Sequence, residues 1–502
     1  MKIKKIRKIN FPLSEFCEDG KKADGTPVLP RQWPLWKKVT TSMFSLFPVA
    51  TIMYTTTSLS TAVPTVPALF ATSKTLASFS FSIPFLGMTS APLYTPYLSD
   101  RFGRKPVLLV YFLLYLAVVV GLTFASTMPQ LLLLRFLIGL LGGPCIVMAE
   151  GTLSQLWPPE RRMTYYAVLA FTQYIGAAAG WLVGVVVLQL FGLPYLSFTA
   201  LLYASLTLGT LFFVPETCVR KILKKHKELD DDMEGWWRPA VLFATTVELV
   251  RDGILKPLWM LVRDPIVIAC SFYLALNYAI VFQFFISGPL LLRNKYGFTF
   301  GQTSLAFVGM LIGSMVSLTF NILVDFLGAW RGPRDADGKP RMENRLLPTL
   351  TGGIMLSSAL FAVGFTVNAR GNVKLVFTGI VILTWGTMDI LVSLVSYVSD
   401  AYSRQHAMTA ITAMAFARYF SAGIMPVFAI KLAENLPTKV LFAGYGGMTL
   451  VMLPVPFVLF YYGQRLIQRS GFSCRDPNNS DSRQEMEEDS DVDEIMDEKQ
   501  RK

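Results

Sequence analysis

Twelve long apolar runs dominate the pattern of hydrophobic and polar positions along the chain. Each run is about as long as the roughly 20 residues that a helix needs to cross the hydrocarbon core of a bilayer. The runs are continuous, whereas the strands of a membrane β-barrel show about ten residues of alternating polarity. The pattern therefore predicts twelve transmembrane helices, near residues 39–60, 76–98, 106–126, 129–154, 164–190, 194–214, 265–290, 303–325, 347–367, 373–399, 407–430 and 438–462.

A long polar segment at 215–264 separates the first six runs from the last six. We expect an N-terminal half at 39–214 and a C-terminal half at 265–462. A basic segment at 1–38 precedes them, and a tail at 463–502, acidic and with few apolar residues, follows and should be disordered. The fold class expected is an all-α membrane protein of two six-helix halves.

A short internal repeat is consistent with two related halves. Asp100-Arg-Phe-Gly103 follows the second run, and Asp325-Phe-Leu-Gly328 follows the eighth at the same spacing. The two segments therefore occupy matching positions in the two halves, as a duplicated architecture predicts.

The composition agrees with a membrane protein. Hydrophobic residues make up 53% of the 502 residues and charged residues 16%, against about 45–50% and about 25% in soluble domains. A single buried core stops growing near roughly 250–300 residues. So much apolar surface excludes an ordinary soluble protein, a disordered chain and a disulfide scaffold.

The net charge of +12 reflects the distribution of basic residues between the runs. Most of the 46 Lys and Arg residues fall in alternate connectors and in the two terminal segments. Short cytoplasmic loops carry such an excess. We therefore expect a multi-pass protein of the plasma membrane with both termini and the 215–264 loop in the cytoplasm, and no nucleic-acid partner. The first run has no evident cleavage site and reads as an uncleaved anchor.

The sequence contains little that indicates a metal site, a cofactor or an enzymatic activity. The five cysteines show no paired spacing, and His226 and His406 both lie in polar segments. No G-x-x-x-x-G-K-[ST] motif occurs, so the chain should not hydrolyse ATP itself. A membrane enzyme would need a convergent set of His, Asp and Glu, which the runs lack. We expect no metal, no cofactor and no enzymatic activity.

The connector between the second and third runs concentrates charged and turn-forming residues. Gly103 permits a positive φ, Arg104 and Lys105 can anchor the inner membrane face, and Asp100 can accept hydrogen bonds at a neighbouring helix N-terminus. Together with Arg101, these residues form a candidate conformational switch. The alternative is an ordinary basic turn.

This connector resembles motif A of the major facilitator superfamily, G-x-L-x-D-R-x-G-R-K, with Pro96 in place of the first Gly. Further matches follow in the family's order: Pro64-Thr-Val-Pro67, Arg135-x-x-x-Gly139, Trp157-Pro-Pro-Glu-Arg-Arg162, Pro215-Glu-Thr217, Glu343-Asn-Arg-Leu346 and Asp400-Ala-Tyr402. The chain is most similar to fungal-type twelve-span drug:H⁺ antiporters. The resemblance implies a transporter built from two halves.

The fifth run departs from the antiporter pattern. Gly176, Gly180 and Gly184 retain the spacing of small residues that lets membrane helices pack closely. Trp181, however, stands where these antiporters carry a proline, and Ile138 replaces the usual Gln of the fourth run. These departures leave the direction of transport open.

Arg135, Glu150, Asp389 and Arg418 lie inside the runs and away from their ends, where charged side chains are costly and usually functional or paired. Arg135 resembles the family's arginine associated with proton coupling, and a carboxyl group at Asp389 or Glu150 can carry a proton. These three are the proton-coupling candidates. The alternatives are a salt bridge between Asp389 and Arg418, and a Glu150 carboxylate at the level of the lipid headgroups.

Polar side chains within the runs are candidates for a substrate cavity, namely Arg418, Gln173, Asn277 and Gln283. The amide side chains can instead join helices by hydrogen bonds. In the tail, Ser490 precedes Asp491 and Asp493, so it is a possible phosphorylation site, with an inert solubilising tail as the alternative.

These observations lead to a functional hypothesis. We expect a monomeric, proton-coupled secondary transporter that binds a small amphiphilic compound near the membrane midplane and exports it by alternating access. Its partners would be the small-molecule substrate, protons and the lipid bilayer. Two alternatives remain open, an uptake symporter for a nutrient or organic acid and a non-transporting membrane receptor.

Overall fold

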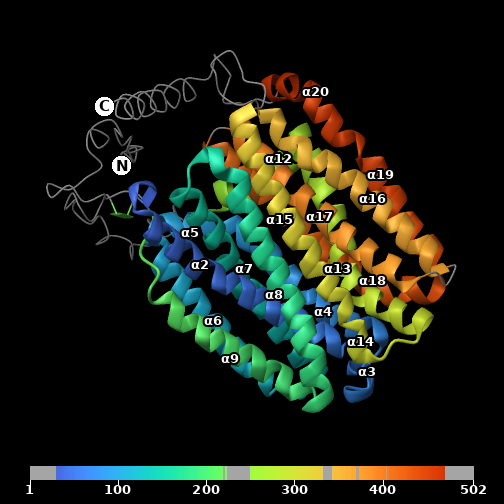
Figure 1. Cartoon of the computed structure of the whole chain (residues 1–502). Helices are drawn as coiled ribbons and strands as arrows, with labels where there is room; N and C mark the ends of the chain where they lie inside the picture. Colours follow the sequence, from blue (N-terminus) through green and yellow to red (C-terminus); the bar gives the residue numbers. More distant parts are fainter. Residues whose placement is uncertain are drawn as a thin grey trace, which may run out of the picture.

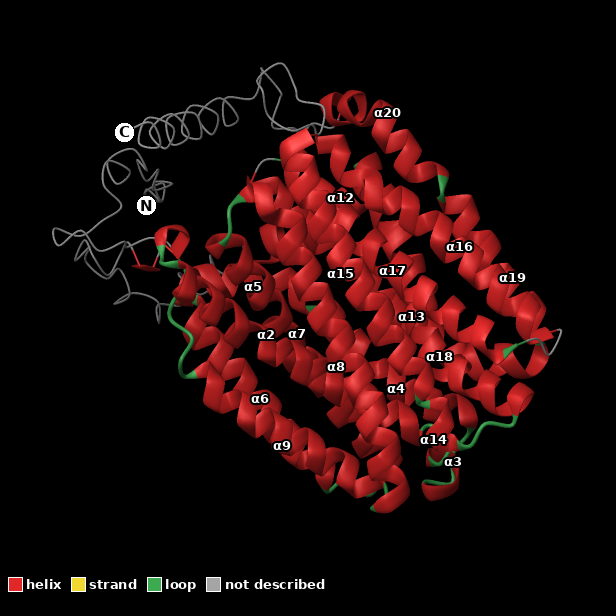
Figure 2. Ribbon diagram, viewed as in Figure 1, coloured by secondary structure: helices red, strands yellow, loops and turns green. Residues whose placement is uncertain are grey.

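The computed structural model describes residues 30–218, 221–222, 249–331, 342–368, 372–402 and 404–469. Within these ranges the chain forms helices joined by short connectors, with no strand (Figure 2). Most of the predicted 215–264 loop, and the tail with Ser490, lie outside the described residues.

The first six predicted runs fold as the helices of the N-terminal half. In chain order these are α2 (Leu35–Ser58), α4 (Lys74–Thr89) with α5 (Ala91–Phe102), α6 (Arg104–Thr123), α7 (Met128–Leu156), α8 (Arg162–Leu190) and α9 (Leu193–Leu211). Short turns η1 (Pro30–Gln32), η2 (Leu59–Ala62), α3 (Val66–Leu69) and η3 (Pro159–Arg161) lie between or before them.

The last six runs fold as the C-terminal half. They are α13 (Pro265–Tyr296), α15 (Leu305–Arg331), α16 (Leu347–Asn368), α17 (Val373–Ala401), α18 (Arg404–Asn435), and α19 (Thr438–Met452) with α20 (Pro454–Arg469). Shorter elements are η5 (Leu249–Leu255), α12 (Lys256–Arg263), α14 (Phe300–Thr303) and η6 (Met342–Leu346).

Length and apolarity identify most of these helices as membrane spans. Of the described helices, nine are long and apolar enough to cross a bilayer, and the pair α4 and α5, bent by 42°, makes a tenth. The bend lies at Ser90, and Pro92 follows it with no backbone N–H to donate. The two remaining predicted runs are α2 and α9, which carry more hydroxyl side chains.

The hydroxyl residues of α2 are buried in the bundle. Thr55 donates to the carbonyl of Thr51 at 2.9 Å and accepts from the Tyr115 hydroxyl at 2.7 Å. The Thr51 and Thr207 hydroxyls lie 2.6 Å apart and join α2 to α9. The buried hydroxyl groups of this polar span therefore form hydrogen bonds within the helix and to neighbouring helices, and do not face lipid.

The three glycines of α8 face α2. A Cβ added at Gly176 would lie 2.4 Å from the carbonyl oxygen of Ala50, and one at Gly180 would lie 2.6 Å from that of Tyr54. At Gly184 the corresponding distance to the Ser58 carbonyl oxygen is 3.0 Å. Any side chain at these positions would push the two helices apart.

The two halves lie side by side, blue to green and yellow to red in Figure 1. They meet where α4 packs on α18 and where α8 packs on α15 and α17. The approach of α4 to α18 is close, because a Cβ at Gly423 would lie 2.5 Å from Leu86 Cδ2. At the end that carries Asp100, η5 contacts α5 and α12 contacts α18, so the segment before α13 touches both halves.

Candidate functional site

Four charged side chains meet between the halves at the end of the bundle that carries Asp100, hereafter the Asp100 end. Arg162, at the start of α8, pairs with Asp400 on α17. Arg345 in η6 pairs with Asp400 and lies 3.6 Å from Asp325 at the end of α15. We call these four residues the ionic cluster. It joins one side chain of the N-terminal half to three of the C-terminal half.

Asp325 also binds the N-terminus of α8 directly. Its Oδ2 accepts hydrogen bonds from the Thr164 backbone N–H at 3.2 Å and the Thr164 hydroxyl at 2.5 Å. The first N–H groups of a helix have no intrahelical partner and favour a negative charge. Arg345 adds a bond to the carbonyl of Pro159 at 3.0 Å. The halves are thus closed at the Asp100 end.

The connector around Asp100 is held within the N-terminal half. Gly103 has φ +92° and separates α5 from α6. The carboxylate of Glu216 accepts from the backbone N–H groups of Arg104 at 3.1 Å and Lys105 at 3.2 Å, and so caps α6. The Lys105 ammonium donates to the Phe212 carbonyl at 3.0 Å. These contacts tie α6 to the segment that follows α9.

The two arginines of this connector point to different neighbours. The buried Arg104 guanidinium donates to the carbonyl of Gly151 on α7 at 2.5 Å. Arg101 donates to the Tyr97 hydroxyl at 3.5 Å on its own helix. Asp100 is exposed and interacts electrostatically with Arg104.

Arg135 is fully buried and donates only to backbone carbonyls in the described chain. Its guanidinium bonds Ser80 at 3.1 Å, Thr55 at 3.0 Å and Thr56 at 2.8 Å. These contacts join α7 to α4 and to the end of α2. Since an arginine side chain stays protonated in proteins, Arg135 provides a fixed positive charge within the N-terminal half.

Asp389 lies inside the C-terminal half. Its Oδ1 accepts from the Ser317 hydroxyl at 2.5 Å and the Asn321 amide at 2.6 Å, both on α15. Its Oδ2 has no hydrogen-bond partner among the described residues. The alternative of a salt bridge between Asp389 and Arg418 is wrong, because the carboxylate turns toward α15 and its Cβ faces Gly352 on α16.

Arg418 lies in the middle of α18, between two tyrosine rings. Its guanidinium carbon is 5.4 Å from the ring centre of Tyr278 and 4.9 Å from that of Tyr419. One long hydrogen bond reaches the Tyr419 hydroxyl at 3.4 Å. The Nε atom has no partner in the described part of the chain, although the residue is only 7% exposed.

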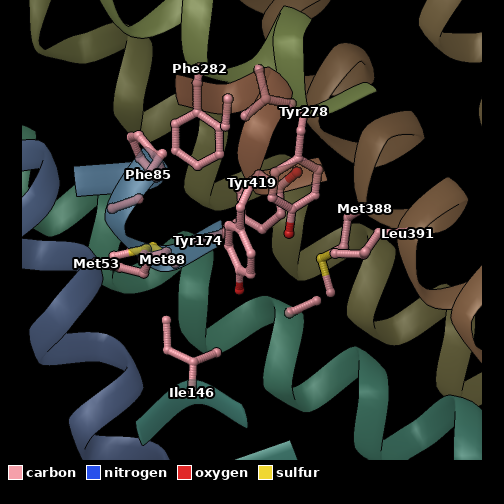
Figure 3. Close-up of a cluster of buried hydrophobic side chains, with 14 of the residues drawn as sticks. Met53, Phe85, Met88, Ile146, Tyr174, Tyr278, Phe282, Met388, Leu391 and Tyr419 are labelled. Carbon is pink, nitrogen blue, oxygen red and sulfur yellow. The ribbon is translucent and has the colours of Figure 1, made fainter. Parts of the chain in front are cut away.

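Tyr278 and Tyr419 belong to a cluster of buried side chains between the halves (Figure 3), and Arg418 borders this cluster through its contacts with the two rings. The Tyr278 hydroxyl donates to Gln173 on α8 at 3.4 Å, and the hydroxyls of Tyr174 and Thr387 lie 3.1 Å apart. Both contacts cross from one half to the other. We call this the central cluster, whose apolar members include Met53, Phe85, Met88, Ile146, Phe282, Met388 and Leu391.

The other predicted cavity residues are distributed around this cluster. Asn277 donates to the Thr387 carbonyl at 2.8 Å and so joins α13 to α17. Glu150 on α7 is partly buried and interacts electrostatically with Arg418 across the interface between the halves. Gln283 lies apart, in a narrow pocket that it lines with Ser287 and Tyr445 between α13 and α19.

Aromatic rings join the halves toward the opposite end. Trp181 stacks on Phe307 of α15 with ring centres 4.5 Å apart and an angle of 15°. Phe300 contacts the same indole at 6.0 Å. A salt bridge of 2.6 Å between Lys74 and Glu434 also crosses here. The halves are therefore in contact on both sides of the central cluster.

The ionic cluster was not predicted as a site from the sequence. Its residues did lie in segments recognised for other reasons, since Arg162 ends one quoted motif and Asp400 begins another. Arg345 and Glu216 fall inside two further motifs. A search for opposite charges at the predicted ends of spans would have found these residues, but not their pairing.

Comparison with known proteins identifies the family. Its sequence model matches residues 46–426. The efflux pump radE of Floropilus chiversii is 26% identical over 475 residues, covering 89% of this chain and 84% of the pump. The Candida albicans multidrug transporter FLU1 is 26% identical and covers 89% of this chain and 74% of that protein. The Escherichia coli proton:xylose symporter XylE has a similar structure, with a TM-score of 0.63 at 15% identity over 86% of this chain and 96% of XylE. Because the family match spans both halves, this chain belongs to the Major Facilitator Superfamily.

Proposed function

We propose that this chain is a proton-driven exporter of small amphiphilic organic compounds. The observation that carries the proposal is the central cluster, a set of aromatic, Met and polar side chains enclosed between two halves that touch on both sides of it. Such a site, near the middle of the spans and made by both halves, suits alternating access. The protein works as a monomer in the plasma membrane, with the Asp100 end and both termini in the cytoplasm.

Two sets of contacts act as gates in this proposal. The ionic cluster and the bond from Asp325 to Thr164 must break before the Asp100 end can open. The stacking of Trp181 on Phe307 must break before the opposite end can open. Substrate reaches the central cluster from the cytoplasm in the first state and leaves in the second.

Export is favoured over uptake by the relatives. The radE protein is named an efflux pump and FLU1 a multidrug transporter, each matched over most of this chain. XylE is a symporter, but at 15% identity it supports the shared fold alone. A transporter of this type needs no enzymatic step.

Proton coupling is assigned to the two buried or partly buried carboxylates. Glu150 interacts electrostatically with Arg418, which borders the central cluster, so a proton on Glu150 and a bound substrate can influence each other. Asp389 lies inside the C-terminal half, where Ser317 and Asn321 of α15 hold its carboxyl group. Arg135 holds α2, α4 and α7 together as a fixed charge rather than carrying the proton itself.

Transport into proteoliposomes tests this function. The purified protein is reconstituted and supplied with a panel of labelled amphiphiles of negative, neutral and positive charge. An antiporter accumulates its substrate when the lumen is acidic, and a protonophore abolishes the accumulation. Glu150→Gln or Asp389→Asn should leave exchange intact while removing its dependence on the proton gradient.

The alternatives give different results in the same vesicles. An uptake symporter accumulates substrate when the external solution is the more acidic one. A non-transporting receptor binds members of the panel but produces no flux under either gradient. Either result would refute proton-driven export.

A further inference from the structure

We infer that the transported compound carries a negatively charged group, such as a carboxylate, which binds Arg418 in the central cluster. This inference rests on the proposed transport function and specifies the class of substrate. It starts from the charge of Arg418, which the described chain leaves poorly compensated.

A buried guanidinium is costly unless an anion or several acceptors surround it. Arg418 is 7% exposed, has one hydrogen bond of 3.4 Å, and keeps an Nε without a partner among the described residues. Asp389 is bound by Ser317 and Asn321 on α15. Glu150 interacts with Arg418 electrostatically, but the ion pairs in the described ranges do not include Arg418.

Two tyrosine rings flank the Arg418 guanidinium, and its Nε has no hydrogen-bond partner among the described residues. The rings of Tyr278 and Tyr419 lie at 88° to each other, and each is within 5.4 Å of the guanidinium carbon. Ring faces stabilise the cation without using its N–H groups. The planar fork of an arginine binds carboxylates through two parallel hydrogen bonds.

The rest of the cluster suits an apolar body attached to that anionic group. Met53 and Met88 come from the N-terminal half, and Met388 comes from the C-terminal half (Figure 3). Methionine side chains adapt to varied apolar shapes and favour contact with aromatic rings. A flat or aromatic body held there, with its anion on Arg418, touches both halves at once.

The membrane potential adds a physical reason for this charge. A potential that is negative inside drives an anion outward. The same potential drives the exchanged proton inward. Both movements of one exchange cycle therefore draw on the potential as well as on the proton gradient.

Ligand stabilisation of the purified full-length protein tests the inference. The probes share one aromatic body: 1-pyrenebutyrate, its uncharged amide, and 1-pyrenemethylammonium. The wild-type protein should be stabilised against heat by the carboxylate at about tenfold lower concentration than by the amide, as a charged hydrogen bond predicts. Arg418→Gln should remove this preference, and Arg418→Lys should retain part of it.

Arg293→Gln provides a matched loss of one positive charge, because Arg293 is exposed at the end of α13 opposite to Asp100. It should keep the wild-type preference. Equal stabilisation by carboxylate and amide would overturn the inference, as would an unchanged preference in Arg418→Gln. If Arg418→Gln does not fold, a wild-type preference in the neutral variant Arg418→Met would overturn it.

Flux measurements separate this inference from the proposed function. Export of the neutral and cationic probes without preference for the carboxylate would leave the transport function standing and refute the anionic substrate. A carboxylate preference that depends on Arg418, without any flux, would refute transport and support the anion site.

Discussion

The two Asp-x-x-Gly segments occupy matching positions in the two halves and make different contacts. In the N-terminal half, Glu216 closes the turn by capping α6, and this contact lies within one half. In the C-terminal half, Asp325 reaches the other half and bonds Thr164 at the start of α8. The segment that matches the family motif less well therefore makes the contact between the halves.

The two repeats therefore have different roles: one carboxylate caps a helix of its own half, and the other caps a helix of the opposite half. A carboxylate at a helix N-terminus is favourable in both places, but the helix it caps differs. If the halves rock against each other as proposed, the helix capped near Gly103 moves together with its cap and the contact persists. At Asp325 the cap and the helix belong to opposite halves, so the contact has to break whenever the Asp100 end opens.

The largest effect is expected from Arg345→Gln. Arg345 contacts both Asp325 and Asp400, and its loss leaves two carboxylates near each other with less positive charge. Removing one partner of a fully buried ion pair costs about 3 kcal/mol or more. The cost here is somewhat lower, because the Arg345 and Asp400 side chains are each 15% exposed. Transport should fall steeply while the protein remains in the membrane.

The measurement is the labelling rate of a cysteine introduced at Ser399, which is buried in the closed state, in a background without native cysteines. Labelling should accelerate in Arg345→Gln. Lys74→Gln is the matched control, because its salt bridge with Glu434 also joins the halves but is exposed and worth little. Slow labelling in both variants would show that the ionic cluster does not hold the Asp100 end closed.

A smaller effect is expected from Gly103→Ala. The substitution forces a non-glycine residue to φ +92° and places a Cβ 2.7 Å from Glu216 Oε2. Gly192→Ala imposes the same strain at φ +93°, with no atom within 4 Å of the new Cβ. At both positions the positive φ is combined with an extended ψ, a region that is essentially limited to glycine and costs roughly 1–3 kcal/mol for other residues. Any additional loss of stability at Gly103 therefore measures the contact between the new Cβ and Glu216.

Thermal denaturation of the purified variants, followed together with flux, provides the comparison. Gly103→Ala should be less stable than Gly192→Ala and should transport more slowly. Identical losses in the two variants would mean that the contact with Glu216 does not constrain the connector.

The smallest and most selective effect is expected from exchanging each carboxylate for its amide. Glu216→Gln should lower stability by about 1 kcal/mol or less, because one charged cap of α6 becomes neutral. Labelling at position 399 should not change, since this contact lies within one half. Asp325→Asn should accelerate the labelling, and the reverse pattern would contradict the different roles of the two repeats.

The arrangement of helices was largely predictable from the sequence. Each of the twelve apolar runs is helical, because a run of about 20 apolar residues has few other ways to satisfy its backbone in lipid. The bend between α4 and α5 was not predicted, although Pro92 lies at that position.

The contacts of the candidate site were much less predictable. Asp389 and Arg418 have similar depths in the sequence pattern, but depth does not reveal which neighbour a side chain faces, and Asp389 faces Ser317. Asp400 and Arg162 lie 238 positions apart, so their pairing depends on how the halves pack. Local patterns locate such charges without indicating their partners.

The buried hydroxyls of α2 have a consequence for how the protein is made. During synthesis α2 enters the translocon before α7, α8 and α9 exist, yet these are helices that it packs against. Its Thr and Ser residues make the insertion of α2 into lipid less favourable than that of the more apolar spans, because insertion depends on the apolarity of the segment. Stable insertion of α2 therefore waits for the synthesis of its partners, and a ribosome that stalls before α8 would leave a poorly anchored nascent chain exposed to quality control.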